Sequence, residues 1–93
     1  MNVIVETLVK RAAAELMAAG AHEVFVFGSA AKDTMGPDSD IDMAVSGLPK
    51  AIFYRVGARL DELAGRTVDL VDLDMDTPLT QHLRRRNELV RVG

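Results

Sequence analysis

The spacing of apolar residues changes along the chain, and each spacing predicts a type of element. Between residues 3 and 19 apolar side chains recur every three or four positions, which predicts an amphipathic helix that ends at Gly20. The runs 23–27, 40–45 and 67–73 are short, rich in apolar and β-branched residues and bounded by turn residues, so we expect strands there.

Further helices are predicted between and after these strands. A short helical turn over 29–32 follows the first strand. A longer helix begins at Pro49 and ends before Gly65, with an apolar stripe along one side. Thr77 is suited to cap a last helix, because a proline follows it at the first helical position, and this helix runs as far as Arg86.

Helices and strands therefore alternate along a chain of 93 residues, which is the length of one domain. Residues 89–92 are expected to add a final edge strand. We predict a single domain over residues 1–93 of the α/β or α+β class, with helices packed on a small mixed sheet of about four strands.

Composition narrows the class of protein. A hydrophobic content of 48 % is typical of a folded globule and not of a disordered chain. The absence of cysteine excludes disulfides, a thiol nucleophile and a cysteine metal site. Charged residues interrupt the N-terminal apolar positions and no apolar run has the length of a membrane span, so we expect a cytoplasmic protein without a signal peptide.

The distribution of charge gives little sign of nucleic-acid binding. The formal net charge is −3, whereas a general nucleic-acid binder usually carries a basic footprint. The only basic cluster, Arg84, Arg85 and Arg86, falls in the last turn of the last predicted helix. It could steer a nucleotide, but a solvated face that complements the helix dipole is the simpler interpretation.

Gly28 and Ser29 stand where the first strand passes into a helical turn. Backbone N–H groups at such a turn favour an anion, glycine permits close approach of a phosphate, and serine adds a hydroxyl donor. An ordinary strand–helix turn often has the same two residues, so this pair alone does not establish a phosphate site.

Asp40 and Asp42 stand two residues apart in an otherwise apolar strand. Side chains two apart on a strand point to the same face, where two like charges repel each other. A divalent cation relieves that repulsion, and Mg²⁺ prefers carboxylates together with phosphate oxygens, as in two-metal sites for phosphoryl transfer. The alternative is a polar strand face turned towards water.

A third carboxylate, Asp69, interrupts the apolar run of the next strand. If that strand lies beside the one with Asp40 and Asp42, the three acids can form one cluster. A position of Asp69 on the reverse side of the sheet would exclude such a cluster. Solvated charges near the start of the last helix are the expected role of Asp72, Asp74 and Asp76.

The combination of Gly28-Ser29, Asp40-Ile41-Asp42 and Asp69 resembles the minimal nucleotidyltransferase family of the DNA polymerase β-type superfamily. This resemblance implies a polymerase β-like fold and transfer of a nucleoside monophosphate, AMP from ATP, to a hydroxyl acceptor with release of pyrophosphate. It implies that Gly28, Ser29 and Lys32 bind the nucleotide. Catalysis and binding of two Mg²⁺ ions are implied for Asp40, Asp42 and Asp69.

The resemblance also implies a partner. Minimal nucleotidyltransferases are often encoded beside small helical HEPN proteins and act as the antitoxin of the pair, and some adenylylate a tyrosine of the toxin. A HEPN-family partner is therefore expected, and the chain is expected to form a homo- or hetero-oligomer. Asp33 departs from the family pattern, because it stands where a glycine is common and adds an anion near the phosphates. The alternative function is a catalytically weak or inactive module that neutralises its partner by contact.

Overall fold

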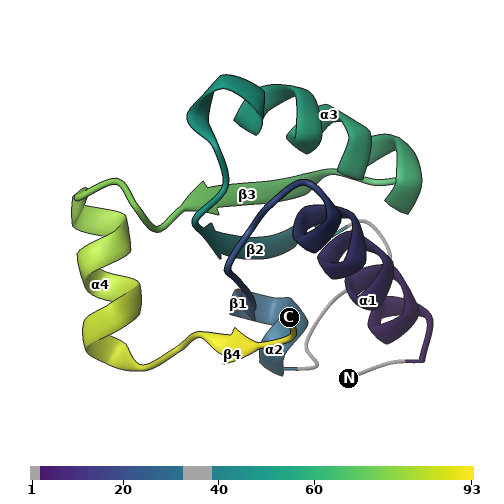
Figure 1. Ribbon diagram of the computed structural model, residues 1–93. Coiled ribbons are helices and arrows are strands. Elements are labelled where there is room, and N and C mark those ends of the chain that lie inside the picture. Colours follow the sequence, from purple (N-terminus) through teal and green to yellow (C-terminus); the bar gives the residue numbers. More distant parts are fainter. Residues whose placement is uncertain (1–2, 33–38) are drawn as a thin grey trace.

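The computed structural model describes residues 3–32 and 39–93, and Figure 1 shows its helices and strands. Every helix and strand predicted from the sequence is present within these residues. In chain order the elements are α1 (Val3–Ala18), β1 (Glu23–Phe27), α2 (Gly28–Lys32), β2 (Ile41–Ser46), the 3₁₀ turn η1 (Lys50–Ile52), α3 (Phe53–Ala64), β3 (Val68–Asp72), α4 (Pro78–Arg86) and β4 (Val90–Arg91).

Several element boundaries differ from the prediction by a residue or two, as at α2, β3 and β4, and two differences concern the elements around the acids. Pro49 precedes the 3₁₀ turn η1, and the long helix α3 begins only at Phe53. The strand expected from Asp40 begins one residue later and includes Ser46, so Asp40 lies just outside β2. The C-terminal end of α3 agrees with the prediction, because Gly65 has the left-handed conformation (φ 66°) that ends many helices.

The four strands form one mixed sheet in the order β3-β2-β1-β4. β1 is antiparallel to both β2 and β4, whereas β2 and β3 are parallel. A parallel pair needs a crossover connection, and α3 supplies it between β2 and β3. The sheet therefore ends in β3 on one side and in the short strand β4 on the other.

One face of the sheet carries the hydrophobic core. The helices α1 and α3 cover this face, as Figure 1 shows. Their apolar stripes are buried against alternate residues of the strands, as expected for helices that pack on a sheet. The buried cluster includes Val9, Ala12 and Leu16 of α1, Val24 and Val26 of β1, Ile41, Met43 and Val45 of β2, Val56 and Leu60 of α3, and Val68 of β3.

The last helix, α4, has the N-terminus that its sequence predicts. The hydroxyl of Thr77 accepts a hydrogen bond from the N–H of Thr80 (3.2 Å), and the hydroxyl of Thr80 accepts one from the N–H of Thr77 (3.0 Å). Pro78 occupies the first turn, where its missing N–H costs nothing. The guanidinium of Arg84 donates to the carbonyl of Leu73 (3.1 Å) and so ties α4 to the end of β3.

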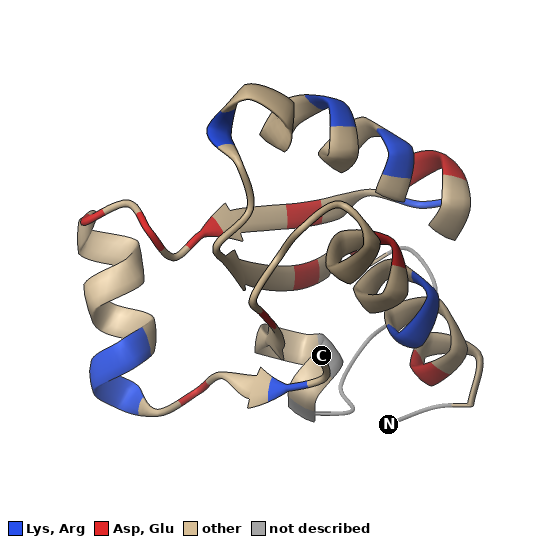
Figure 2. Ribbon diagram, viewed as in Figure 1, with Lys and Arg blue, Asp and Glu red and all other residues tan. Residues whose placement is uncertain are grey.

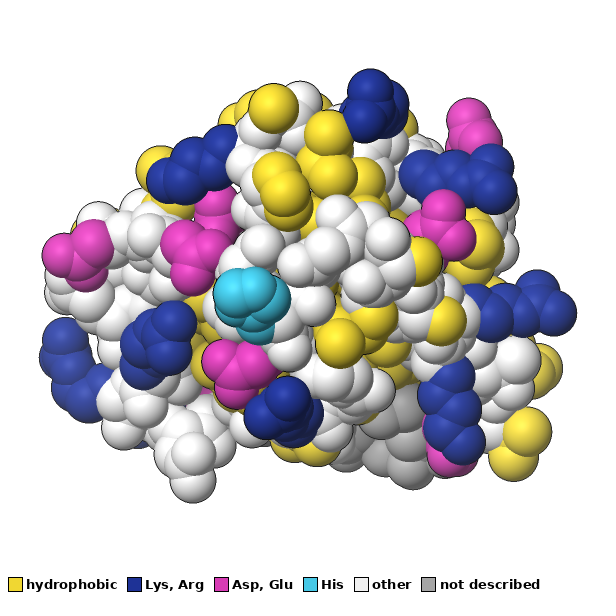
Figure 3. Space-filling model, in the orientation of Figure 1, with side chains coloured by type: hydrophobic (Ala, Val, Ile, Leu, Met, Phe, Trp, Pro, Cys, Tyr) yellow, Lys and Arg dark blue, Asp and Glu magenta, His cyan; other side chains and the backbone are white. Residues whose placement is uncertain are grey.

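The surface drawn in Figure 3 carries charges of both signs around a group of apolar side chains. Basic side chains do not gather into one patch on this face. Within residues 3–32 and 39–93, none of the helices combines the length and the apolar composition that crossing a membrane requires.

Candidate active site

Asp42 and Asp69 are direct neighbours across the parallel pair of β2 and β3. The register pairs Asp42 with Asp69 and, one residue earlier, Ile41 with Val68. Paired residues point to the same face of a sheet, and successive residues point to opposite faces. Because Ile41 and Val68 belong to the core, both carboxylates point to the other face. Figure 2 shows acidic residues on adjacent stretches of β2 and β3.

We call this side of the sheet the acid face and define it by Phe27, Asp42 and Asp69. Phe27, the last residue of β1, pairs with Asp42 in the antiparallel register. Asp42 therefore lies between an aromatic residue of β1 and a second carboxylate on β3. Its side chain is half-buried, whereas Asp69 is exposed.

Gly28 brings the backbone of the strand–helix turn against the carboxylate of Asp42. Its φ of +64° lies in the left-handed region, which glycine adopts without strain. A Cβ atom built on Gly28 would lie 2.5 Å from Oδ2 of Asp42 and 3.4 Å from its Cγ. Only glycine combines this backbone conformation with this close approach. Ser29, the next residue of α2, is half-buried beside this contact.

Asp40 adds a third negative charge near Asp42. It lies two residues before Asp42, and its side chain is exposed. The pKa of Asp42 is raised from its ordinary value of 3.8 by partial burial, then by the charge of Asp69, then by that of Asp40. Asp42 is therefore close enough to both Asp69 and Asp40 for its charged form to be repelled by theirs.

The donor set of the acid face suits a divalent cation. A half-buried carboxylate with two carboxylate neighbours is costly, and a cation such as Mg²⁺ removes the cost because oxygen ligands are those it prefers. The side chains have not converged fully, since residues 3–32 and 39–93 contain no group of three His, Asp or Glu side chains that could already hold a metal ion. Repulsion between like charges is a sufficient reason for them to stay apart.

One residue of the predicted nucleotide site, Lys32, is described only in part. Lys32 is the last residue of α2, but its side chain lies outside what the structure describes. Asp33, the departure from the family pattern, lies outside the described residues altogether. The described part of the site thus consists of the turn at Gly28 and Ser29 together with Asp40, Asp42 and Asp69.

The remaining acids near α4 hold loops together instead of joining this cluster. Oδ2 of Asp74 accepts a hydrogen bond from the N–H of Gly47 (2.7 Å), and Oδ1 of Asp76 accepts one from the amide of Gln81 (2.8 Å). Oδ1 of Asp72 accepts from the N–H of Asp74 (2.9 Å). The sequence predicted solvated charges here. It gave no signal for the contact of Asp74 with Gly47, because these residues are brought together only by the fold, whereas the other two contacts are local in sequence.

Comparison with solved structures identifies relatives of this fold. A structure assigned provisionally as a minimal nucleotidyltransferase is 32 % identical, with a TM-score of 0.74 and coverage of 95 % of both chains. A toxin–antitoxin complex with AMP-PNP is 21 % identical, with a TM-score of 0.70, over 92 % of this chain and 70 % of that one. The MntA–HepT toxin–antitoxin complex is 20 % identical, with a TM-score of 0.63, over 91 % and 69 %.

Sequence comparison gives the family. No curated protein matches the chain. The model of the family described as "Polymerase beta, Nucleotidyltransferase" matches residues 15–91, which include Gly28, Ser29, Asp40, Asp42 and Asp69. Together with the fold and the position of the acids, this match establishes that the chain belongs to the polymerase β nucleotidyltransferase family.

Proposed function

We propose that the protein is a Mg²⁺-dependent nucleotidyltransferase that transfers AMP from ATP to a hydroxyl group, a tyrosine of a partner toxin of the HEPN family, and so acts as an antitoxin. The observation that carries this proposal is the pairing of Asp42 with Asp69 across β2 and β3, directly beside the glycine turn at Gly28. Solved relatives of the same fold include toxin–antitoxin complexes, one of them with AMP-PNP, which supports the partner and the nucleotide.

The residues of the glycine turn and the three acids each have a role in this proposal. The N–H groups of Gly28 and Ser29, with the ammonium of Lys32, hold triphosphate oxygens. Asp40, Asp42 and Asp69 would hold up to two Mg²⁺ ions, which supply charge neutralisation at the entering and leaving oxygens of an in-line displacement. Asp69 lies on β3, an edge strand of the sheet, and accepts the proton of the acceptor hydroxyl.

The nucleotide part of the proposal is tested by thermal unfolding with MgCl₂, with ATP and with both. We expect stabilisation that needs both together, since ligand at a hundred times its dissociation constant stabilises a folded protein by about 2.7 kcal/mol. Asp42→Asn should abolish the shift. Asp76→Asn is the matched control, because it removes one exposed carboxylate that bonds the side chain of Gln81 and lies outside the group of three acids. No shift in the natural sequence at millimolar Mg²⁺ and ATP would refute the proposal.

The acceptor part is tested by co-expression with the product of the adjacent gene, followed by intact-mass analysis of that product. We expect additions of the mass of AMP that are lost with Asp42→Asn and retained with Asp76→Asn. A tightly bound partner without any addition would instead support the alternative function, neutralisation by contact. The residue that favours this alternative is Asp33, which stands where the family has a glycine.

A further inference from the structure

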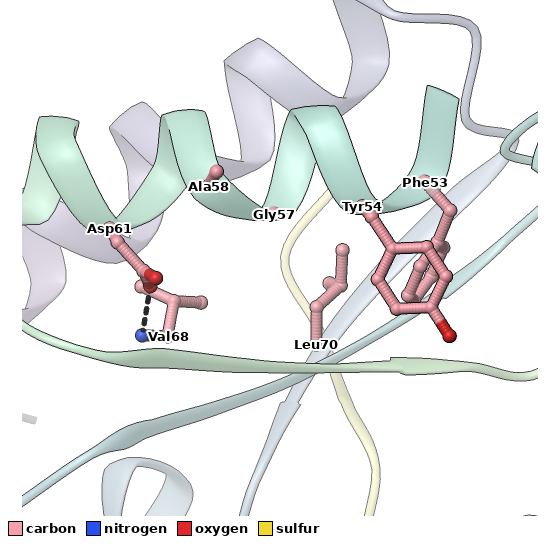
Figure 4. Close-up of a pocket in the computed structure, with 7 residues that line it drawn as sticks. All are labelled: Phe53, Tyr54, Gly57, Ala58, Asp61, Val68 and Leu70. Carbon is pink, nitrogen blue, oxygen red and sulfur yellow. Dashed lines mark hydrogen bonds between the residues drawn. The ribbon is translucent and has the colours of Figure 1, made fainter. Parts of the chain in front are cut away.

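A groove runs between α3 and the edge strand β3, on the core side of the sheet and away from the acid face. Its cavity has a volume of about 320 Å³ and is lined by Phe53, Tyr54, Gly57, Ala58, Asp61, Val68 and Leu70. Figure 4 shows the ring of Tyr54 projecting from α3 towards β3, with Leu70 on the floor of the groove. Tyr54 is 87 % exposed and packs edge-to-face on Phe53, with ring centroids 5.5 Å apart.

The outer edge of β3 has backbone groups that the sheet does not use. Thr67 and Leu73 are bonded to β2, through Ile41 N–H to Thr67 C=O (3.0 Å) and Leu73 N–H to Val45 C=O (2.8 Å). Alternate residues of a strand bond the same neighbour, so Val68, Leu70 and Asp72 direct their N–H and C=O groups outwards. The N–H of Val68 donates to Oδ1 of Asp61 (2.7 Å), and among the described residues no such bond is found for the N–H of Leu70.

No packing contact in the described part of the chain explains why residue 57 is a glycine. It lies within α3, its φ is not positive, and a Cβ atom built on it would have no neighbour within 4 Å. Glycine within a helix costs about 0.5–1 kcal/mol relative to alanine, and here no internal contact offsets that cost. A close approach of another chain to α3 would explain why a residue this small lines the groove.

We propose that the edge of β3 binds the acceptor as an added antiparallel strand, which places the acceptor hydroxyl opposite Asp69. This inference rests on the proposed function and names the way in which its protein substrate is bound. The residue of the added strand opposite Leu70 exchanges both main-chain hydrogen bonds with it, and its side chain enters the groove beside Gly57 and Tyr54.

The register then fixes which side chain of the acceptor reaches the acid face. The residue after the groove residue lies opposite Asp69 and points to the same face as that carboxylate. This pair is not hydrogen-bonded through the backbone, and such pairs have Cα atoms only about 4.5 Å apart. A tyrosine, serine or threonine at this position is therefore adjacent to the acids without any change in the fold.

Charge adds a second requirement for the acceptor. Asp61 lies beside Val68 at one end of the groove, and Asp72 shares the face of Leu70 at the other end of β3. Residues two before and two after the groove residue face these acids. The preferred acceptor segment therefore has five residues in this order: a basic residue, any residue, the apolar groove residue, a residue with a hydroxyl side chain and a second basic residue.

The transfer step forms one bond to phosphorus and breaks another. The acceptor oxygen forms a bond to the α-phosphorus of ATP, the bond from that phosphorus to the oxygen bridging to the β-phosphate breaks, and pyrophosphate leaves. The proton of the hydroxyl passes to the carboxylate of Asp69. The product is the AMP ester of the acceptor side chain.

Two blocked peptides of the same composition test the inference, with Mg²⁺ and ATP labelled at the α-phosphate. The first is Ala-Lys-Ala-Leu-Tyr-Lys-Ala, and the second, Ala-Lys-Ala-Tyr-Leu-Lys-Ala, exchanges the groove residue and the acceptor. We expect labelling of the first to be about a hundredfold faster, because misplacement of a reacting group by an ångström costs about that factor. Hydrogen exchange of the Leu70 amide should slow when the first peptide is present. Equal labelling of the two peptides, or unchanged exchange at Leu70, would overturn the inference.

A variant of the groove separates docking from chemistry. Gly57→Leu fills the groove where the structure has open space, so the fold should tolerate it. It should lower labelling of the first peptide about tenfold, since the apolar anchor loses its pocket, and leave the Mg²⁺–ATP thermal shift unchanged. Ala14→Leu, on the exposed side of α1, is the control and should change neither.

The outcomes distinguish this inference from the proposed function. If the protein binds Mg²⁺ and ATP but labels neither peptide, the added-strand inference is wrong and the proposed function stands. If it does not bind Mg²⁺ and ATP, the proposed function itself fails, and the inference fails with it. Self-association that Gly57→Leu abolishes would assign the groove to a second copy of the chain and would also overturn the inference.

Discussion

Asp42 carries the largest electrostatic cost among the residues of the acid face. Burial and the charges of Asp69 and Asp40 raise its pKa, so the folded protein holds this proton more tightly than the unfolded chain does. The stability that results is fully present below the ordinary value of 3.8 and is lost as the pH rises through the higher pKa of the folded state.

The direction of this pKa shift predicts how the effect of Asp42→Asn on stability depends on pH. Without divalent cations, the substitution should raise the free energy of unfolding at neutral pH, and the difference should vanish below the ordinary pKa of the carboxyl group. Urea denaturation in EDTA over a series from about pH 3 to about pH 8 measures it. Asp76→Asn should show no such gain. A loss of stability at neutral pH with Asp42→Asn would mean that Asp42 is stabilising in its charged form.

Gly28 should be the least replaceable glycine of the site. Gly28→Ala places a Cβ atom 2.5 Å from Oδ2 of Asp42 on a backbone with φ +64°. The left-handed backbone alone costs about 1–3 kcal/mol for a residue other than glycine, and the displaced carboxylate should weaken Mg²⁺ binding as well. Chemical denaturation and Mg²⁺ titration measure the two effects. Gly57→Ala is the control and should gain about 0.5–1 kcal/mol, because its Cβ meets nothing.

At the scale of elements, α4 depends on its capping box. Thr77→Ala removes the acceptor for the N–H of Thr80 and should cost about 1 kcal/mol of unfolding free energy. None of the residues assigned to the site lies in α4. The Mg²⁺–ATP thermal shift should therefore stay the same in size while the melting temperature without ligand falls. Differential scanning fluorimetry with and without ligand separates the two. A reduced shift would show that α4 contributes to nucleotide binding.

Elements were the part of the fold that the sequence predicted best. Period and turn residues located each strand and helix, since apolar residues at strand spacing and caps such as Thr77 and Gly65 act over a few residues. The boundary at Pro49 was wrong because a proline fits a 3₁₀ turn as well as an α-helix. The pairing of Asp42 with Asp69 lay beyond the sequence, because it depends on how the crossover through α3 returns the chain so that β3 lies beside β2.

The contacts within the site were also inaccessible from the sequence. The Gly28-Ser29 pattern indicated a turn but not that the carboxylate of Asp42 lies against it, since Gly28 follows β1 and Asp42 belongs to β2. The groove gave no motif, because Gly57 and Leu70 are ordinary residues until α3 lies over the edge of β3. The family resemblance suggested the role proposed for the acids, and the register gave the arrangement of Asp42 and Asp69.

At the scale of the whole molecule, the hydrophobic core and the acid face lie on opposite sides of the sheet, with α1 and α3 on one side and Asp42 and Asp69 on the other. Titration with Mn²⁺ in place of Mg²⁺ should therefore broaden the amide NMR signals of Phe27, Asp42 and Asp69 and spare those of Val9 and Leu16 in α1. Asp42→Asn should remove the selective broadening. Broadening centred on α1 or α4 would place the cation elsewhere.

The parallel pairing of β2 and β3 has a consequence for the length of the chain. The return path through α3 sets where β3 starts, and a shift of one residue in a strand turns every side chain to the opposite face. A single insertion or deletion at residues 65–67 would bury Asp69 and expose Val68. Length polymorphism among active relatives should therefore be absent from this link, however freely its side chains vary.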